Sequence, residues 1–282
     1  MTSTTFVGIG AIGLPMATLL MKAGYDVTGV DPSPSARARA DANSIAAVAN
    51  IRDATRADTV IVMVATPDQL EALVTNAKDD VADQTWIIMS TVGPDSITTQ
   101  AKRLKAAGAS VVDAPVTGGV ARAKTGELVI FAAGQVDAVA GVTPILSVLG
   151  TVRNVGEKIG EGQAIKVVNQ HLCSVHIVAA AEALSLAESL GLEKEAVLDL
   201  VRGGAAGSWM LSDRGPRMLL GSDAPVTSTI GIFVKDSTLV AAAAAGSGAS
   251  VPLLDIARAR FGAAAQAGLT LRDDSRVIET YK

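Results

Sequence analysis

The chain has 282 residues, of which 49% are hydrophobic and 18% are charged, and its formal net charge is −4. This length allows one or two domains with an ample core, and the mean hydropathy of +0.38 indicates a compact protein with much buried surface. Because the charges are spread without basic blocks, the composition argues against a nucleic-acid partner.

Cysteine usage and the apolar segments bear on the compartment. The single cysteine, Cys173, excludes an intrachain disulfide and fits a reducing environment, and its apolar helical surroundings favour a core or site-wall role over a catalytic thiol. No run of 18 or more apolar residues is present, and the first residues run straight into an apolar strand, which leaves no room for a signal peptide. We therefore expect a cytoplasmic protein with no membrane partner.

Strand-like apolar runs alternate with helical stretches in the first half of the chain. The runs lie at 5–9, 26–30, 59–64, 86–89, 110–112 and 128–133, and helices are expected near 11–23, 34–41, 68–77, 94–107 and 136–147. This alternation predicts a parallel, doubly wound α/β sheet of the Rossmann type with right-handed crossovers.

The pattern changes after about residue 160. A helical stretch with almost no breaker runs from Gly162 to about Leu190, and the rest of the chain is helical with short glycine-rich joints. The sequence therefore predicts two domains, an α/β domain over residues 1–161 and an all-α domain over residues 162–282. The long apolar helix is expected to lie where the domains meet, a common place for the sites of α/β enzymes.

Residues 5–31, TFVGIGAIGLPMATLLMKAGYDVTGVD, have the order of a nucleotide-binding βαβ unit. Gly8 permits a tight turn, Gly10 lets the backbone approach a pyrophosphate, and Gly13 lets the helix pack close to the strand. The helix that opens at Ala11 and Ile12 directs free N–H groups toward the phosphates. The flanking strand and helix patterns favour a dinucleotide site over ordinary glycine turns.

Asp31 lies 18 residues after Gly13, at the tip of the second strand. A carboxylate there can accept hydrogen bonds from the ribose hydroxyls of NAD and would repel the 2′-phosphate of NADP. No arginine follows until Arg37, so NAD is expected rather than NADP. The alternative is that Asp31 only caps a turn with Pro32, Ser33 and Pro34.

Two segments after strands carry polar groups. In Asp113–Gly119 (DAPVTGG), paired glycines at 118 and 119 let backbone N–H groups converge, and the Thr117 hydroxyl adds a donor. Such a turn suits a carboxylate, although an ordinary Pro-Gly turn fits equally well. Ser90 and Thr91 end the fourth strand, which in a doubly wound fold is the edge where a cofactor lies.

Two helical segments carry lysines. Lys166 and Asn169 stand at i and i+3 of an apolar helix, where a lysine needs either a partner or a depressed pKa, and a depressed pKa would allow proton exchange near neutral pH. The plainer alternative is a lysine whose amine reaches solvent at a helix start. Lys235 and Asp236 enter a later apolar helix, where a surface ion pair is the alternative.

In order and spacing, these segments resemble the β-hydroxyacid dehydrogenase family, which includes 3-hydroxyisobutyrate and tartronate semialdehyde enzymes. FVGIGAIGLPMA is similar to the family's cofactor turn, STVGP to its fourth-strand end, DAPVTGG to its substrate loop, GEGQAIKVVNQ to its catalytic segment and FVKD to its late lysine motif. The resemblance covers nearly the whole chain. It implies reversible hydride transfer between a small anionic hydroxy acid and NAD.

The resemblance also implies the residue roles. It places the substrate carboxylate on Thr117, Gly118 and Gly119, although Thr117 stands where a serine is commoner. Lys166 is implied as the acid/base and Asn169 as a group that orients the substrate. Lys235 is implied to lie near the nicotinamide end, and Thr91 at the cofactor edge; no metal site is expected.

Some features bear on substrate choice. Arg122, beside the substrate loop, can recognise a larger or more hydroxylated acid, or it is a solvated arginine next to Lys124. NQHLCSVHIVAAAEAL resembles the branch of the family that acts on four-carbon sugar acids such as threonate. His171 and His176 do not match the family's catalytic positions and are interpreted as packing or wall residues.

Other functions stay open. Imine reductases resemble the family but usually replace the lysine found here at Lys166, and a catalytically inactive NAD-binding module would also lose it; a short-aldehyde reductase is a further alternative. Sugar-phosphate relatives are longer and carry a His-Asn pair where this chain has Asn169 and Gln170. The long helix and the apolar C-terminal half lead us to expect a homodimer or homotetramer.

Overall fold

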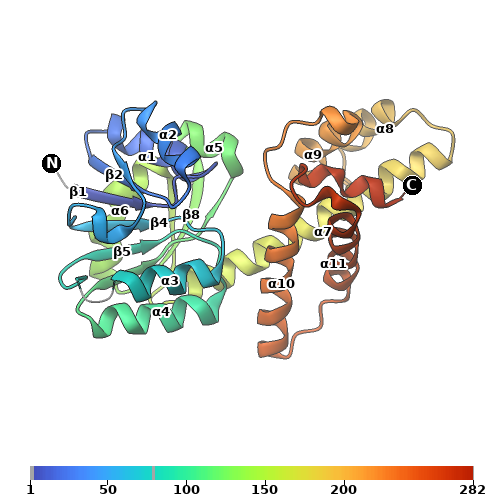
Figure 1. The fold of residues 1–282 in the computed structure, drawn as a ribbon. Coiled ribbons are helices and arrows are strands. Elements are labelled where there is room, and N and C mark those ends of the chain that lie inside the picture. The colour runs from blue at the N-terminus through green and yellow to red at the C-terminus, as the bar shows by residue number, and fades with distance from the viewer. Residues whose placement is uncertain (1–2, 78–79, 282) are drawn as a thin grey trace. The chain divides into compact units, whose positions relative to one another are not determined.

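Figure 1 shows the computed structural model, which describes residues 3–77 and 80–281. The chain divides into two compact units, Met1–Lys166 and Val167–Lys282. The division falls within one helix, α7 (Glu161–Ser189), so its first residues belong to the first unit. The domain border between residues 161 and 162 stays a prediction.

The described part of the first unit contains a nine-stranded sheet in the order β3-β2-β1-β4-β5-β6-β8-β7, with β9 paired to β8. Its strands are β1 (Ser3–Val7), β2 (Asp26–Val30), β3 (Ala47–Val48), β4 (Thr59–Val62), β5 (Thr85–Ile88), β6 (Ser110–Asp113), β7 (Val116–Thr117), β8 (Leu128–Ala133) and β9 (Gly150–Gly156). The doubly wound Rossmann prediction is confirmed. The strand order turns outward on both sides of β1 and β4, which is where such folds bind dinucleotides.

Helices cover both faces of this sheet. They are α1 (Gly13–Lys22), α2 (Pro34–Asp41), α3 (Pro67–Ala77), α4 (Pro94–Ala106), α5 (Gly119–Thr125) and α6 (Val136–Leu149). One core packs α1, α2, α5 and α6 against the sheet, and a second packs α3 and α4 on the other face; α3 and α4 lie together in Figure 1. Strand residues alternate between the cores, as with Ile61 and Val62, which is why the central strands are apolar throughout.

The expectation of a wholly parallel sheet is wrong at β8. The strands from β3 to β6 are parallel, but β8 runs antiparallel to β6 and β7 and parallel to β9. The residues between Asp113 and Leu128 are divided between β7 and the short α5, so no long crossover remains to return the chain for parallel pairing. β3, β7, β9 and α5 were not predicted.

The second unit is helical, as the sequence predicts. After α7 come α8 (Lys194–Val201), α9 (Trp209–Leu219), α10 (Ile230–Ser247), α11 (Pro252–Ala264) and a C-terminal 3₁₀ helix, η4 (Asp274–Tyr281). Ser208 and Thr229 cap the starts of α9 and α10, each accepting a hydrogen bond from a backbone N–H three residues later. Phe233 of α10 stacks on Phe261 of α11 with ring centroids 5.0 Å apart, in the core of this unit.

Within the part of the chain that the structure describes, two helices, α7 and α10, reach the length and mean hydropathy of a membrane-spanning segment. Their most apolar 18-residue windows are 39% and 33% buried inside the protein. Core helices of water-soluble proteins meet the same criteria, so length and composition alone are weak support for a membrane span.

A cluster of buried charges joins η4 and the residue before it to α9. Arg214 donates to both carboxylate oxygens of Asp274, at 2.8–3.2 Å, and Arg217 donates to Asp273 at 3.0 Å. Asp213 accepts from both arginines. Asp274 is fully buried, and this burial raises the pKa of its carboxyl although Arg214 opposes the rise. Because these charges have left water, each depends on its partners.

We therefore expect Arg214→Leu to lower the free energy of unfolding by about 3–5 kcal/mol, since it leaves the Asp274 carboxylate buried without its main partner. Arg202→Ala is the matched control, because the Arg202–Asp199 pair is solvent-exposed and such pairs contribute less than about 1 kcal/mol. Urea unfolding of both variants measures the difference. Equal losses would contradict the importance of this cluster.

Candidate active site

The glycine turn after β1 has the geometry that a dinucleotide requires. Gly8 has a φ of +87°, and a Cβ there would overlap the carbonyl oxygen of Met63. A Cβ on Gly13 would overlap the carbonyl oxygen of Gly8, so α1 packs directly on the turn. Nothing lies within 4 Å of where a Cβ on Gly10 would stand, which leaves its backbone open to a pyrophosphate. Ala11 and Ile12 follow as the entry to α1.

Asp31 follows β2 and is partly buried. Its carboxylate accepts hydrogen bonds from the Ile9 N–H at 3.1 Å and from the Ser33 N–H at 2.9 Å. The turn-capping alternative is thus present in the structure, but the bond to Ile9 also ties Asp31 to the glycine turn. Arg37 donates to the backbone carbonyls of Asp31 and Pro32, so its guanidinium lies at the same turn.

The loop after β6 brings three predicted substrate residues together. Thr117 ends the short strand β7, and Gly118 and Gly119 follow with φ of +132° and +67°, a backbone that favours glycine. The exposed Arg122 folds back over this loop: a Cβ on Gly118 would come within 2.9 Å of the Arg122 stem. The structure therefore places the Arg122 stem beside this loop, and a contact of Arg122 with substrate stays a prediction.

Gln163, in the first turn of α7, is the centre of a buried hydrogen-bond network that the sequence did not reveal. Its Oε1 accepts from the N–H groups of Val92 and Gly93, both at 3.0 Å. Its Nε2 donates to the Ser90 carbonyl at 2.9 Å and to Asp113 Oδ1 at 3.1 Å. All four positions of the amide are used, and the side chain is fully buried. This amide fixes the loop after β5, which contains Thr91, to the start of α7.

Asp113 completes the network from the end of β6. Its Oδ2 accepts from the N–H groups of Gly160 and Gln163, both at 3.0 Å, so the carboxylate caps the start of α7. A side chain on Gly162 would meet the carbonyl oxygens of Phe131 and Asp113, which explains how the helix lies so close to the sheet. Burial raises the pKa of Asp113 to about 6, and the hydrogen bonds from Gln163 and Gly160 oppose that rise.

Lys166 lies three residues after Gln163 on α7 and is 6% exposed. The sequence-based alternative of a lysine that reaches solvent does not match this burial. Asn169, a further three residues along, is partly buried, and i, i+3 spacing puts both side chains on one side of the helix. On α10, Lys235 forms an ion pair with the buried Asp236 at 2.7 Å, so this pair is not the surface pair considered as the alternative.

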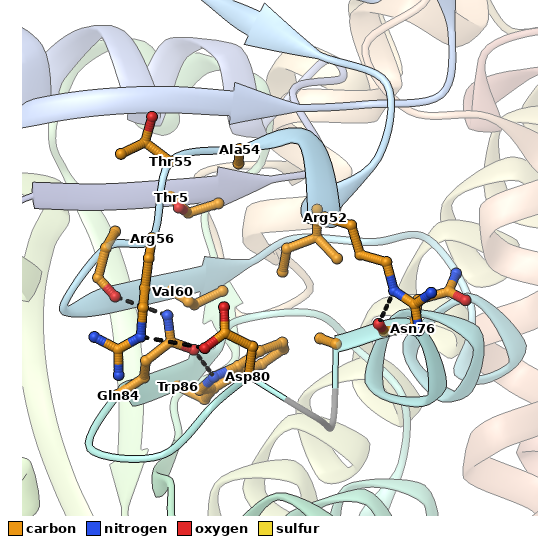
Figure 2. Close-up of a pocket in the computed structure, with 13 residues that line it drawn as sticks. Thr5, Arg52, Ala54, Thr55, Arg56, Val60, Asn76, Asp80, Gln84 and Trp86 are labelled. Atoms are coloured by element: carbon orange, nitrogen blue, oxygen red, sulfur yellow. Dashed lines mark hydrogen bonds and ion pairs between the residues drawn. The ribbon is translucent and has the colours of Figure 1, made fainter.

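A pocket of about 290 Å³ lies elsewhere in the first unit, near the starts of β4 and β5 (Figure 2). Several of its polar groups bond to one another or to the backbone: Arg56 pairs with Asp80, and Gln84 joins the Ala57 carbonyl to the Trp86 indole N–H. Dinucleotides bind at the opposite, carboxyl ends of parallel strands. This pocket therefore lies at the amino ends of the strands, away from the edge where a dinucleotide would bind. Among residues 3–77 and 80–281, no group of three His, Cys, Asp or Glu side chains could hold a metal ion.

The pKa of Asp113 leads to a prediction about stability. Because the native state retains a proton that the unfolded chain loses above about pH 4, the contribution of Asp113 to stability falls as the pH rises from about 4 to about 6. Asp113→Asn lacks this titration, so its stability relative to the parent should improve by about 3 kcal/mol across that window. Urea unfolding at pH 4, 5, 6 and 7 measures the change, and parallel pH profiles would contradict it.

Comparisons with known proteins cover both units. The model described as the NAD binding domain of 6-phosphogluconate dehydrogenase matches residues 3–160. The model described as NAD-binding of NADP-dependent 3-hydroxyisobutyrate dehydrogenase matches residues 160–281. Among curated proteins, L-threonate dehydrogenase of Cupriavidus necator is 34% identical over 98% of this chain and 94% of its own length. NAD-dependent L-serine dehydrogenase of Pseudomonas aeruginosa is 31% identical over 100% and 98%.

Solved structures of the same kind of enzyme are similar to this chain along its whole length. The 3-hydroxyisobutyrate dehydrogenase of Salmonella typhimurium superposes with a TM-score of 0.92 at 30% identity, covering 99% of this chain and 100% of that one. An imine reductase of Streptomyces aurantiacus has a TM-score of 0.69 at 22% identity over 99% of each chain, a likeness of fold alone. With both halves matched and relatives aligned along its whole length, the chain belongs to the β-hydroxyacid dehydrogenase family of NAD-dependent oxidoreductases.

Proposed function

We propose that this protein interconverts a small hydroxy acid and its oxo acid or semialdehyde, with Lys166 as the general acid/base. The observation that carries this proposal is the burial of Lys166 one turn beyond Gln163, whose amide binds the backbone of residues 90–93 at the cofactor edge of the sheet. Lys166 follows Gln163 on the same helix, so the network that fixes residues 90–93 also fixes the helix turn before it. The relatives named L-threonate and L-serine dehydrogenases support a hydroxy acid as the substrate.

Each site residue has a distinct role in this proposal. Residues 117–119 hold the substrate carboxylate through backbone N–H groups and the Thr117 hydroxyl, and Arg122 adds a positive charge beside them. In oxidation, the Lys166 amine accepts the proton of the substrate hydroxyl as the carbonyl forms. In reduction, the Lys166 ammonium returns that proton and stabilises the growing negative charge on oxygen. Asn169 and Lys235 orient the substrate and the nicotinamide end of the cofactor.

A bound nicotinamide dinucleotide supplies the hydride acceptor or donor. Gly8, Gly10, Ala11, Ile12 and Gly13 form the turn for its pyrophosphate, and Asp31 lies at the ribose position. We infer NAD as the preferred form, because the Asp31 carboxylate would repel a 2′-phosphate. The proximity of Arg37 to the same turn, and the NADP-dependent enzymes named in the second family model, make this preference worth measuring directly.

Steady-state rates with a panel of C3 and C4 hydroxy acids, each with NAD and with NADP, test the proposal. We expect turnover with at least one acid and a higher kcat/KM with NAD. Binding of NADH without turnover of any acid would favour an inactive binding module, and a higher efficiency with NADP would refute the argument from Asp31.

Lys166→Ala should lower kcat by about 10²–10⁴-fold with the affinity for NADH nearly unchanged, because it removes the proton acceptor and no cofactor contact. Lys166→Arg is the matched control: it keeps a positive charge but cannot exchange the proton at neutral pH, so we expect a similar loss. Turnover by either variant at the parental rate would show that Lys166 is not the acid/base.

We further infer a homodimer or homotetramer in the cytosol. Large apolar side chains remain exposed on α7 and α11, namely Ile165, Val168, Leu172, Leu186, Leu253 and Ile256. Ile165, Val168 and Leu172 recur along one side of α7, and exposed apolar surface of this kind commonly marks an interface. Sedimentation equilibrium at micromolar concentration should give a mass of at least twice that of the chain, and monomer alone would refute this inference.

A further inference from the structure

A chain of side-chain interactions within the second unit runs from α10 to α7. It begins at Lys235, whose Nζ lies 2.7 Å from Asp236 Oδ1. Gln170 Nε2 donates to the other carboxylate oxygen, Asp236 Oδ2, at 2.5 Å. Asn169 Nδ2 then donates to Gln170 Oε1 at 2.8 Å and to Cys173 Sγ at 3.4 Å. Two amides, those of Gln170 and Asn169, thus follow a buried carboxylate in series.

The Asp236 carboxylate determines the orientation of the Gln170 and Asn169 side-chain amides. Asp236 is 3% exposed, and an ionised carboxylate can only accept hydrogen bonds. Gln170 must therefore turn its NH₂ group toward Asp236 and its carbonyl oxygen toward Asn169. Asn169 must in turn direct its own NH₂ group at that oxygen. The reverse orientation would bring an amide oxygen against the carboxylate, so the direction of both amides follows from charge.

This direction limits what Asn169 can offer a substrate. Both N–H groups of its amide are directed at Gln170 and Cys173, and its Oδ1 makes no hydrogen bond within residues 3–77 and 80–281. Asn169 can therefore act toward a ligand only as an acceptor. The proton of the reacting hydroxyl goes to Lys166 in the proposed reaction. An acceptor at residue 169 therefore needs a second donor on the substrate.

We propose that Asp236, acting through Gln170, holds Asn169 as a hydrogen-bond acceptor and so selects acids that carry a second donor beside the reacting hydroxyl. The substrate class is then 2,3-dihydroxy acids or 2-amino-3-hydroxy acids, in preference to 3-hydroxy acids with only hydrogen or methyl at C2. Asp236 and Gln170 are positioning residues, and Asn169 makes the contact. This inference rests on the proposed function and deepens it.

Three substrates that differ only at C2 test the selection: glycerate with a hydroxyl, serine with an ammonium group, and 3-hydroxypropanoate with hydrogen. In the parent protein we expect kcat/KM for glycerate or serine to exceed that for 3-hydroxypropanoate at least about tenfold, the effect of one hydrogen bond to a partly buried acceptor. Serine equal to glycerate would identify any donor as sufficient, and serine as slow as 3-hydroxypropanoate would identify the hydroxyl. A preference below about twofold for both would overturn the inference.

Asp236→Asn separates orientation from packing because it keeps the volume. Its oxygen should turn to the Lys235 ammonium, which leaves its NH₂ group facing Gln170 and reverses both amides. Asn169 would then present N–H groups, so the preference for a C2 donor should fall to near one or invert. Ser174→Ala is the matched control, since this buried hydroxyl on α7 donates to the Gln170 backbone carbonyl and lies outside the series; it should keep the parental preference.

Asn169→Asp tests the preference for a C2 donor in a second way, without a change at residue 236. A carboxylate there also accepts only, so it should lower kcat/KM for all three acids by repulsion yet retain the preference between substrates. Loss of the preference in Asn169→Asp, or an unchanged preference in Asp236→Asn, would overturn the inference. If the parent protein oxidises none of the acids in the wider panel, the proposed function fails, and this inference fails with it.

Discussion

The buried amide of Gln163 is the contact on which the candidate site depends. It is bonded on all sides, to the backbone of residues 90–93 and to Asp113, and so joins the ends of β5 and β6 to the first turn of α7. Leaving one of these buried groups unpaired would cost about 1–3 kcal/mol, which makes the arrangement stiff. These bonds also fix where Lys166 lies, because Lys166 follows Gln163 by one turn on the same helix.

Polar groups in this protein are used in two different ways. Asp113 and Gln163 satisfy backbone groups and fix where elements begin, so they act on position. Asp236 and Gln170 act on direction, because a carboxylate that can only accept hydrogen bonds orients the amides beyond it. The ionic cluster of Arg214, Arg217 and the two aspartates before and at the start of η4 does neither; it attaches the end of the chain to α9.

Most of the fold could be predicted from the sequence because the strongest patterns are local. Central strands such as β4 and β5 are apolar on both faces, and the glycine turn keeps its flanking strand and helix in one short segment. The missed elements lack such patterns: β3 has two residues, β9 alternates poorly and carries exposed polar side chains, and α5 is short and begins at the second of two glycines. Antiparallel pairing at β8 could not be predicted, since the strand itself has an ordinary apolar pattern.

The candidate site likewise combines residues that local motifs predict with contacts between distant parts of the sequence. Lys166, Asn169 and the glycine loop are predicted from local motifs, whereas the network around Gln163 could not be, because its partners lie 50 to 73 residues away. The continuity of α7 has one consequence for how such a protein can change. Deleting one residue between Lys166 and Asn169 would rotate everything beyond by about 100° and put the asparagine two positions after the lysine, on the opposite side of the helix. A longer surface loop costs little conformational entropy, but a shortened helix here would separate the two side chains.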